Sequence, residues 1–183
     1  MLNKKILENI KKLGISAAVY FDVAEHEFKF DARFRQLCEA NTCGLYGRNY
    51  MCPPSIGELD ACKGEILSYK QALVVETIHE LEDSFDFEGM MDGGKVHDAN
   101  MNKAWEYIKA NINYKKLKVL GAGGCKVCAN CGILDNVPCR FPERAVSSVE
   151  AHAIDVAHLT ETHGLKYING EDTVTYVGLF LLK

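Results

Sequence analysis

The hydrophobic positions of this chain follow two repeats, one typical of helices and one typical of buried strands. Trp105, Ile108 and Ile112 recur at the spacing of one helical face, whereas ALVVETI (72–78) has the length and composition of a strand. The same reasoning predicts helices over residues 2–12, 31–37, 56–69, 96–112 and 147–163, and strands over 16–23, 72–78, 117–120 and 173–182. Segments 38–57 and 80–94 are predicted to be loops because they are rich in glycine, proline or acidic residues.

Strands that alternate with helices are typical of an α/β architecture, in which helices cover a partly parallel sheet. We therefore expect an α/β, single-domain layered fold with a mixed, partly parallel sheet, in which residues 1–183 form one metal-binding domain. Two cysteine-rich loops are expected at one end of that sheet, where ligand sites usually lie. Asp31 is expected to cap the second helix, and Ser147 or Ser148 the last one.

The composition is that of a soluble globular protein, with 48% apolar and 25% charged residues. A formal net charge of −4 provides no basic surface, which argues against nucleic acid as the main partner. No apolar run is long enough to span a bilayer, and the N-terminus lacks the apolar core of a signal peptide. We therefore expect a cytoplasmic protein that is not bound to a membrane, in a compartment that keeps cysteines reduced.

Eight cysteines stand in two groups of four, and the later group has the tighter spacing. This second cysteine set reads Cys125-x2-Cys128-x2-Cys131-x7-Cys139. Three thiolates within seven residues can point inward at three irons of a cubane, and a more distant cysteine closes the fourth position. Glycines before and after the triplet allow backbone amides to approach the sulfurs and tune the potential of a cluster. The spacing therefore favours a 4Fe–4S cluster on these four cysteines.

Zinc is the alternative metal for this set. Zinc sites made of four cysteines are usually built from two closely spaced pairs, but here Cys131 and Cys139 would form the second pair with seven residues between them. In the bacterial ferredoxin motif, three residues separate the third cysteine from the fourth, and proline follows the fourth. Here seven residues separate Cys131 from Cys139, and Arg140 follows. The likeness to ferredoxin is thus limited to the triplet.

The first cysteine set has a looser spacing, Cys38-x4-Cys43-x8-Cys52-x9-Cys62. Cys52 precedes two prolines, which would present its thiolate with little backbone freedom. Cys62 falls within a predicted helix, where a lone cysteine is often a small buried hydrophobic residue. Two interpretations stay open. Either all four cysteines of this first set hold a second cluster, or the loop that carries them packs against the cluster of the second cysteine set.

The strings CEANTCGLYGRNYMCPP and GGCKVCANCGILDNVPCRFPERAVSSVEAHAID resemble a prokaryotic domain-of-unknown-function family of predicted metal-binding proteins. The matching positions are Cys38, Cys43, Tyr46, Gly47, Cys52, Pro53 and Pro54 in the first string, and Gly124, Cys125, Cys128, Cys131, Pro138, Cys139, Arg140, Pro142, Ser148, Glu150, Ala151, Ile154 and Asp155 in the second. The resemblance covers nearly the whole chain. It implies a bound metal, of the iron–sulfur kind, and no defined substrate.

No catalytic constellation accompanies the cysteines. His152, His158 and His163 do not fall on one helical face, so a histidine metal site is not expected. The sequence therefore predicts an iron–sulfur protein with one or two 4Fe–4S clusters. This protein would transfer electrons to a redox partner protein or support a partner enzyme. A zinc-stabilised structural or interaction module is one alternative. The other is an enzyme with an open iron site, lined by Arg140, Tyr46 and Glu150.

Overall fold

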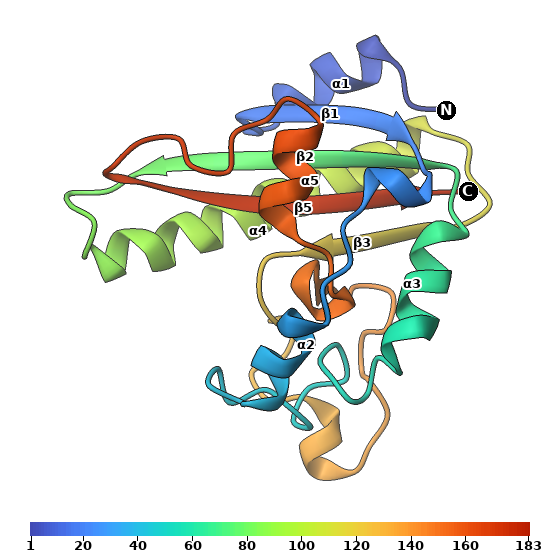
Figure 1. Ribbon diagram of the computed structural model, residues 1–183, viewed down its shortest axis with the longest axis vertical. Coiled ribbons are helices and arrows are strands. Elements are labelled where there is room, and N and C mark those ends of the chain that lie inside the picture. The colour runs from blue at the N-terminus through green and yellow to red at the C-terminus, as the bar shows by residue number, and fades with distance from the viewer.

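The computed structural model describes residues 1–183 and contains one five-stranded sheet (Figure 1). Its strands are β1 (Ala17–Asp22), β2 (Gln71–Glu80), β3 (Leu117–Gly121), β4 (Ser147–Ser148) and β5 (Thr173–Leu182). They lie in the order β1-β2-β5-β3-β4, and all neighbours are antiparallel except β3 and β4, which are parallel. The predicted α/β fold with a mixed, partly parallel sheet is confirmed.

Helices cover both faces of this sheet. They are α1 (Lys4–Lys11), α2 (Ala32–Glu39), α3 (Leu59–Leu67), α4 (Phe87–Asn111) and α5 (Val156–Thr162), with short 3₁₀ turns η1 (Glu25–Glu27), η2 (Gly132–Asp135) and η3 (Glu150–His152). Alternate residues of each strand point to opposite faces. Leu73 and Val75 of β2 therefore pack with α1 and α4, whereas Ala72 and Val74 pack with α3 and α5. Burial on both faces explains why β2 and β5 read as nearly continuous apolar runs.

The cysteine-rich segments gather past the β3 edge of the sheet, below β3 in Figure 1. The second cysteine set follows directly after the end of β3 at Gly121, in the long connection from β3 to the two-residue β4. This connection lies beside α2 in Figure 1. The site thus stands on loops that are anchored to the sheet where β3 ends.

The predicted loop over 80–94 is wrong in its second half, because α4 begins at Phe87. Asp86 caps the helix by accepting a hydrogen bond from the amide of Gly89. The glycines in this stretch favour a loop prediction. In the structure, Gly93 and Gly94 instead allow the helix to pack closely against His79 and Tyr176 of the sheet. Tertiary packing therefore outweighs the low helix propensity of glycine here.

The predicted helix over 147–163 is also wrong in its first half. Ser147–Ser148 form β4, η3 follows, and Ala153 adopts a left-handed conformation with φ of 59° that ends the turn. The helix starts only at Val156, where Asp155 accepts a hydrogen bond from the amide of His158. Pairing of β4 with β3 thus replaces the expected first turns.

None of the helices combines the length and the apolar character that crossing a membrane requires.

The buried carboxyl of Glu76 in β2 makes the free energy of unfolding depend on pH. Its side chain is 1% exposed, one carboxyl oxygen has no hydrogen-bond partner, and burial raises the pKa from 4.5 to about 7. Because the folded-state pKa exceeds the unfolded one, the protonated carboxyl favours the folded state, and this contribution is lost as the pH rises from about 4.5 to about 7. Glu76→Gln is expected to flatten that decline and to raise the free energy of unfolding above pH 7 by roughly 3 kcal/mol.

Urea unfolding at pH 5 and pH 8 measures the effect. Glu80→Gln, at the exposed end of the same strand, is the matched control and should leave the pH dependence unchanged. Equal pH dependence in wild type and Glu76→Gln would show that the buried carboxyl does not titrate as described.

Candidate metal centre

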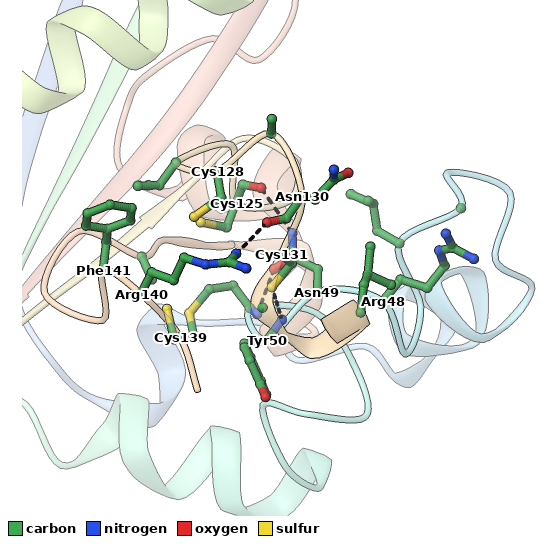
Figure 2. Close-up of a pocket in the computed structure, with 18 residues that line it drawn as sticks. Arg48, Asn49, Tyr50, Cys125, Cys128, Asn130, Cys131, Cys139, Arg140 and Phe141 are labelled. Carbon is green, nitrogen blue, oxygen red and sulfur yellow. Dashed lines mark hydrogen bonds between the residues drawn. The ribbon is translucent and has the colours of Figure 1, made fainter. Parts of the chain in front are cut away.

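The four cysteines of the second set line one cavity of about 310 Å³ (Figure 2). They come from the loop that follows β3, with Cys131 just before η2 and Cys139 beyond it. The opposite wall is formed by a segment between the second and third cysteines of the first set, including Leu45, Arg48 and Tyr50. The two cysteine-rich loops therefore enclose a common space.

Polar contacts hold these loops together. The Tyr50 amide donates to the Sγ of Cys131 at 3.4 Å, and the Asn49 side chain donates to the carbonyl oxygen of Cys125 at 3.0 Å. The hydroxyl of Tyr50 donates to the carbonyl oxygen of Val137 at 3.0 Å. An amide that points at a cysteine sulfur stabilises negative charge on that sulfur, as cluster-binding loops require.

Two glycines make the close approach possible. A Cβ atom at Gly132 would lie 2.8 Å from the carbonyl oxygens of both Val137 and Pro138, so any side chain there would push the loop open. A Cβ atom at Gly124 would lie 2.5 Å from Leu45 and 3.3 Å from the Sγ of Cys52. Gly132 thus closes the second cysteine loop on itself, and Gly124 lets it approach the first.

Arg140 brings a positive charge to the cavity. Its guanidinium donates to Asp135 at 2.7 Å and to the carbonyl oxygen of Asn130 at 3.0 Å, and Figure 2 shows it extended across the pocket toward Asn130. The pKa of Arg140 is raised by Asp135 and, to a smaller degree, by Cys128. The arginine is therefore placed where it can offset negative charge on the thiolates.

Cys38, Cys43 and Cys52 of the first set lie near one another and near the second set. Burial, and then the neighbouring thiols of Cys43, Cys38, Cys125 and Cys131, raise the pKa of the Cys52 thiol to about 11. Burial and then Cys43 likewise raise the pKa of Cys38. Cys52 is thus the cysteine that connects the two sets.

Cys62 is directed elsewhere. Its Sγ, on the buried side of α3, contacts the carbonyl oxygen of Ile56 at 3.4 Å and the guanidinium of Arg35 at 4.0 Å. Burial raises the pKa of this thiol, and the nearest charges are those of Arg35 and Lys118 rather than other cysteines. The structure therefore brings the four cysteines of the second set to one cavity, places Cys52 beside them with Cys38 and Cys43 near Cys52, and leaves Cys62 apart.

Cys62→Ser is expected to leave the metal content unchanged. The serine hydroxyl retains the hydrogen bond to Ile56 but puts a more polar atom in a buried position, so the protein should lose on the order of 1 kcal/mol of stability. Metal analysis and thermal unfolding of the variant measure the two effects. Loss of metal at unchanged stability would instead place Cys62 among the ligands.

The thiols line the cavity without converging on one point. No group of three or more His, Cys, Asp or Glu side chains is close enough to hold a single metal ion. A tetrahedral zinc site needs four sulfurs about 2.3 Å from one ion. A cubane binds each thiolate through a different iron and needs a wider ring of sulfurs. The four thiols around one cavity are thus a donor set of the kind that both zinc sites and iron–sulfur clusters use.

The histidines of the last helix region do not join the site. His163 stacks on Phe21 with ring centroids 3.6 Å apart, and His152 makes a hydrogen bond to the carbonyl oxygen of Ser148. Glu150 is not in the cavity either, although it lies near Cys38. The sequence did not single out Tyr50 and Asn49, and the Tyr50 contact to sulfur carries no sequence signal because every residue except proline has an amide.

Comparisons with known proteins add a family but no activity. A search of the curated proteins found no match. Among solved structures, epoxyqueuosine reductase from Bacillus subtilis matches with 8% identity and a TM-score of 0.42, over 98% of this chain and 45% of that one. Epoxyqueuosine reductase with a modified tRNA stem loop matches with 8% identity and a TM-score of 0.41, over 97% of this chain and 44% of that one. This chain spans less than half of those proteins, and likeness at this level assigns it no role.

The family comparison is decisive because it extends over most of the chain and includes every cysteine described above. Residues 22–182 match the family described as predicted metal-binding protein (DUF2284). The chain belongs to this family of predicted metal-binding proteins.

Proposed function

We propose that the protein binds a 4Fe–4S cluster through Cys125, Cys128, Cys131 and Cys139 and transfers electrons to a partner protein, with residues 1–183 as one metal-binding domain. The observation that carries this proposal is the single cavity lined by all four thiols. Membership of a metal-binding family supports a metal at these cysteines but does not identify it.

When bound, such a cluster supplies one-electron oxidation and reduction. The residues of the chain would set the conditions for it. The Tyr50 amide and the Arg140 guanidinium would stabilise negative charge on the sulfurs, which favours the reduced state. Leu45 and Met51 would limit the access of water to one side of the cavity.

An enzyme with an open iron site is a second candidate, and the separation of Cys62 favours it. Cys38, Cys43 and Cys52 without Cys62 could supply only three thiolates to a second cluster. A cluster with three protein ligands leaves one iron free to bind a small molecule. Under this candidate the first cysteine set would be the reactive centre, and the second set would deliver electrons to it.

Redox cycling tests electron transfer. Protein purified without oxygen should lose its visible absorption when dithionite is added, show an EPR signal of a reduced cluster, and recover its absorption when an oxidised electron acceptor is added. A sample that neither bleaches nor gives an EPR signal would overturn the proposal and favour the zinc-stabilised module.

A further inference from the structure

The first half of β5 has one bare edge. β5 pairs with β2 along its whole length, but its pairing with β3 covers only Leu179–Leu182. Figure 1 shows β5 extending past the end of β3 with no strand beside it on that side. The bare stretch, Thr173–Gly178, contains no charged residue and no proline, which are devices that sheet edges use to prevent pairing. This edge is therefore able to accept another strand.

Backbone groups of this edge point outward without partners. The carbonyl oxygen of Leu182 accepts a hydrogen bond from the amide of Lys70 at 2.9 Å, so Leu182 faces β2. The N–H and C=O of one residue point to the same side of an antiparallel strand, and the side alternates along the strand. Those of Thr175 and Val177 therefore point away from β2, and no group of the chain makes a hydrogen bond to them.

A cavity of about 580 Å³ lies along the same edge. Val174–Val177 border it, with Met91 and Gly94 of α4 on one face of the sheet and Val156 and Tyr167 on the other. Most of the surface that lines the cavity is apolar. The position of the next strand is thus framed by apolar walls on both faces, as for a strand buried inside an α/β sheet.

Glu150 carries the charge in this cavity that has no opposite charge beside it. Lys95 is paired with Asp92 at 2.7 Å, and Lys126 with Asp98 at 2.8 Å, whereas Glu150 makes no salt bridge. Burial raises the pKa of Glu150. A basic side chain beside it would stabilise the ionised carboxylate, so the cavity favours a ligand with one positive charge.

A second copy of this chain is a poor occupant. Two copies cannot meet through their β5 edges, because each edge lies between the walls formed by α4 and Tyr167. Pairing of this edge with the β1 edge of another copy would be head-to-tail and would continue into a filament. An extended segment of another protein is only one strand wide and can reach the edge.

We propose that the bare edge of β5 binds an extended segment of a partner protein as an added strand, with apolar side chains and a lysine or arginine that faces Glu150. Gly123 and Lys126 line the same cavity, so the partner would contact the loop that carries the second cysteine set. The inference stands on this edge and its cavity and does not depend on which metal the cysteines hold.

A fluorescein-labelled peptide, acetyl-Thr-Val-Lys-Val-Thr-Val-amide, is the probe, and fluorescence polarisation should show saturable binding to the intact protein. Thr175→Pro removes the outward amide of Thr175, whereas Thr175→Val keeps it. Loss of one hydrogen bond predicts about fivefold weaker binding to Thr175→Pro and unchanged binding to Thr175→Val. Glu150→Gln should weaken binding about tenfold, and should not affect an analogue with norleucine in place of lysine.

A second measurement uses wild type only and covers the case in which Thr175→Pro does not fold. Val177 has its side chain on the α5 face and its amide at the bare edge. Peptide residues opposite such positions share that face and point their own amides at β5. N-methylation of the peptide's lysine and two threonines should therefore weaken binding at least fivefold, and N-methylation of its three valines should not. No saturable binding, equal binding to Thr175→Pro and Thr175→Val, or equal effects of the two N-methylations would each overturn the proposal.

Discussion

Under the proposed function, replacing Cys131 with serine is expected to remove most of the iron and the brown colour that a bound cluster would give. Cys131 lines the cavity of the second cysteine set and accepts a hydrogen bond from the Tyr50 amide, so its loss removes one ligand and one link between the two loops. Even residues outside the ligand shell change metal affinity by roughly 10–100-fold, so loss of a ligand should cost at least as much.

The comparison with Cys62→Ser makes this test specific. Both substitutions exchange sulfur for oxygen in the same cysteine-rich protein, but only Cys131 borders the cavity. Iron and acid-labile sulfide, measured per chain after purification without oxygen, should fall in Cys131→Ser and stay at the wild-type level in Cys62→Ser. Equal iron in Cys131→Ser and wild type would remove the second set from the proposed site.

Gly132→Ala is expected to lower metal affinity by about 10–100-fold, although no ligand is altered. The added Cβ would lie 2.8 Å from two backbone oxygens, which cannot move aside as the end of a flexible side chain could. The loop must therefore open between Cys131 and Cys139, and the four thiols can no longer surround one cavity.

Gly64→Ala is the matched control because a Cβ at that position meets no atom within 4 Å. Gly64 lies inside α3, where alanine should stabilise the helix by up to about 1 kcal/mol. Competition with a chelator measures the metal affinity of both variants. Unchanged affinity in Gly132→Ala would mean that the close backbone approach is not needed for metal binding.

The periodicity of the sequence predicts most elements of the fold, and its failures have a common cause. β2 and β5 were recognisable because they are buried on both faces and have strand-like composition. The start of α4 cannot be recognised in the sequence, because its glycines pack against His79 and Tyr176 and do not form a turn. The local pattern after Ser147 predicts a helix because it cannot reveal the long-range pairing of β4 with β3.

The cysteine sites show the same limit. The second set is predictable because three of its members are so close in sequence that they must be close in space. The approach of Cys52 to Cys125, and the separation of Cys62, depend on how a long irregular loop folds over another one. Spacing alone could not supply either result.

The measurement that tests the central claim most directly is the content of iron, acid-labile sulfide and zinc in protein purified without oxygen, with a visible spectrum of the same sample. The account predicts about four irons and four sulfides per chain with a broad brown absorption, and about eight of each where the first cysteine set holds a second cubane. Stoichiometric zinc without sulfide, in a colourless sample, would contradict the account.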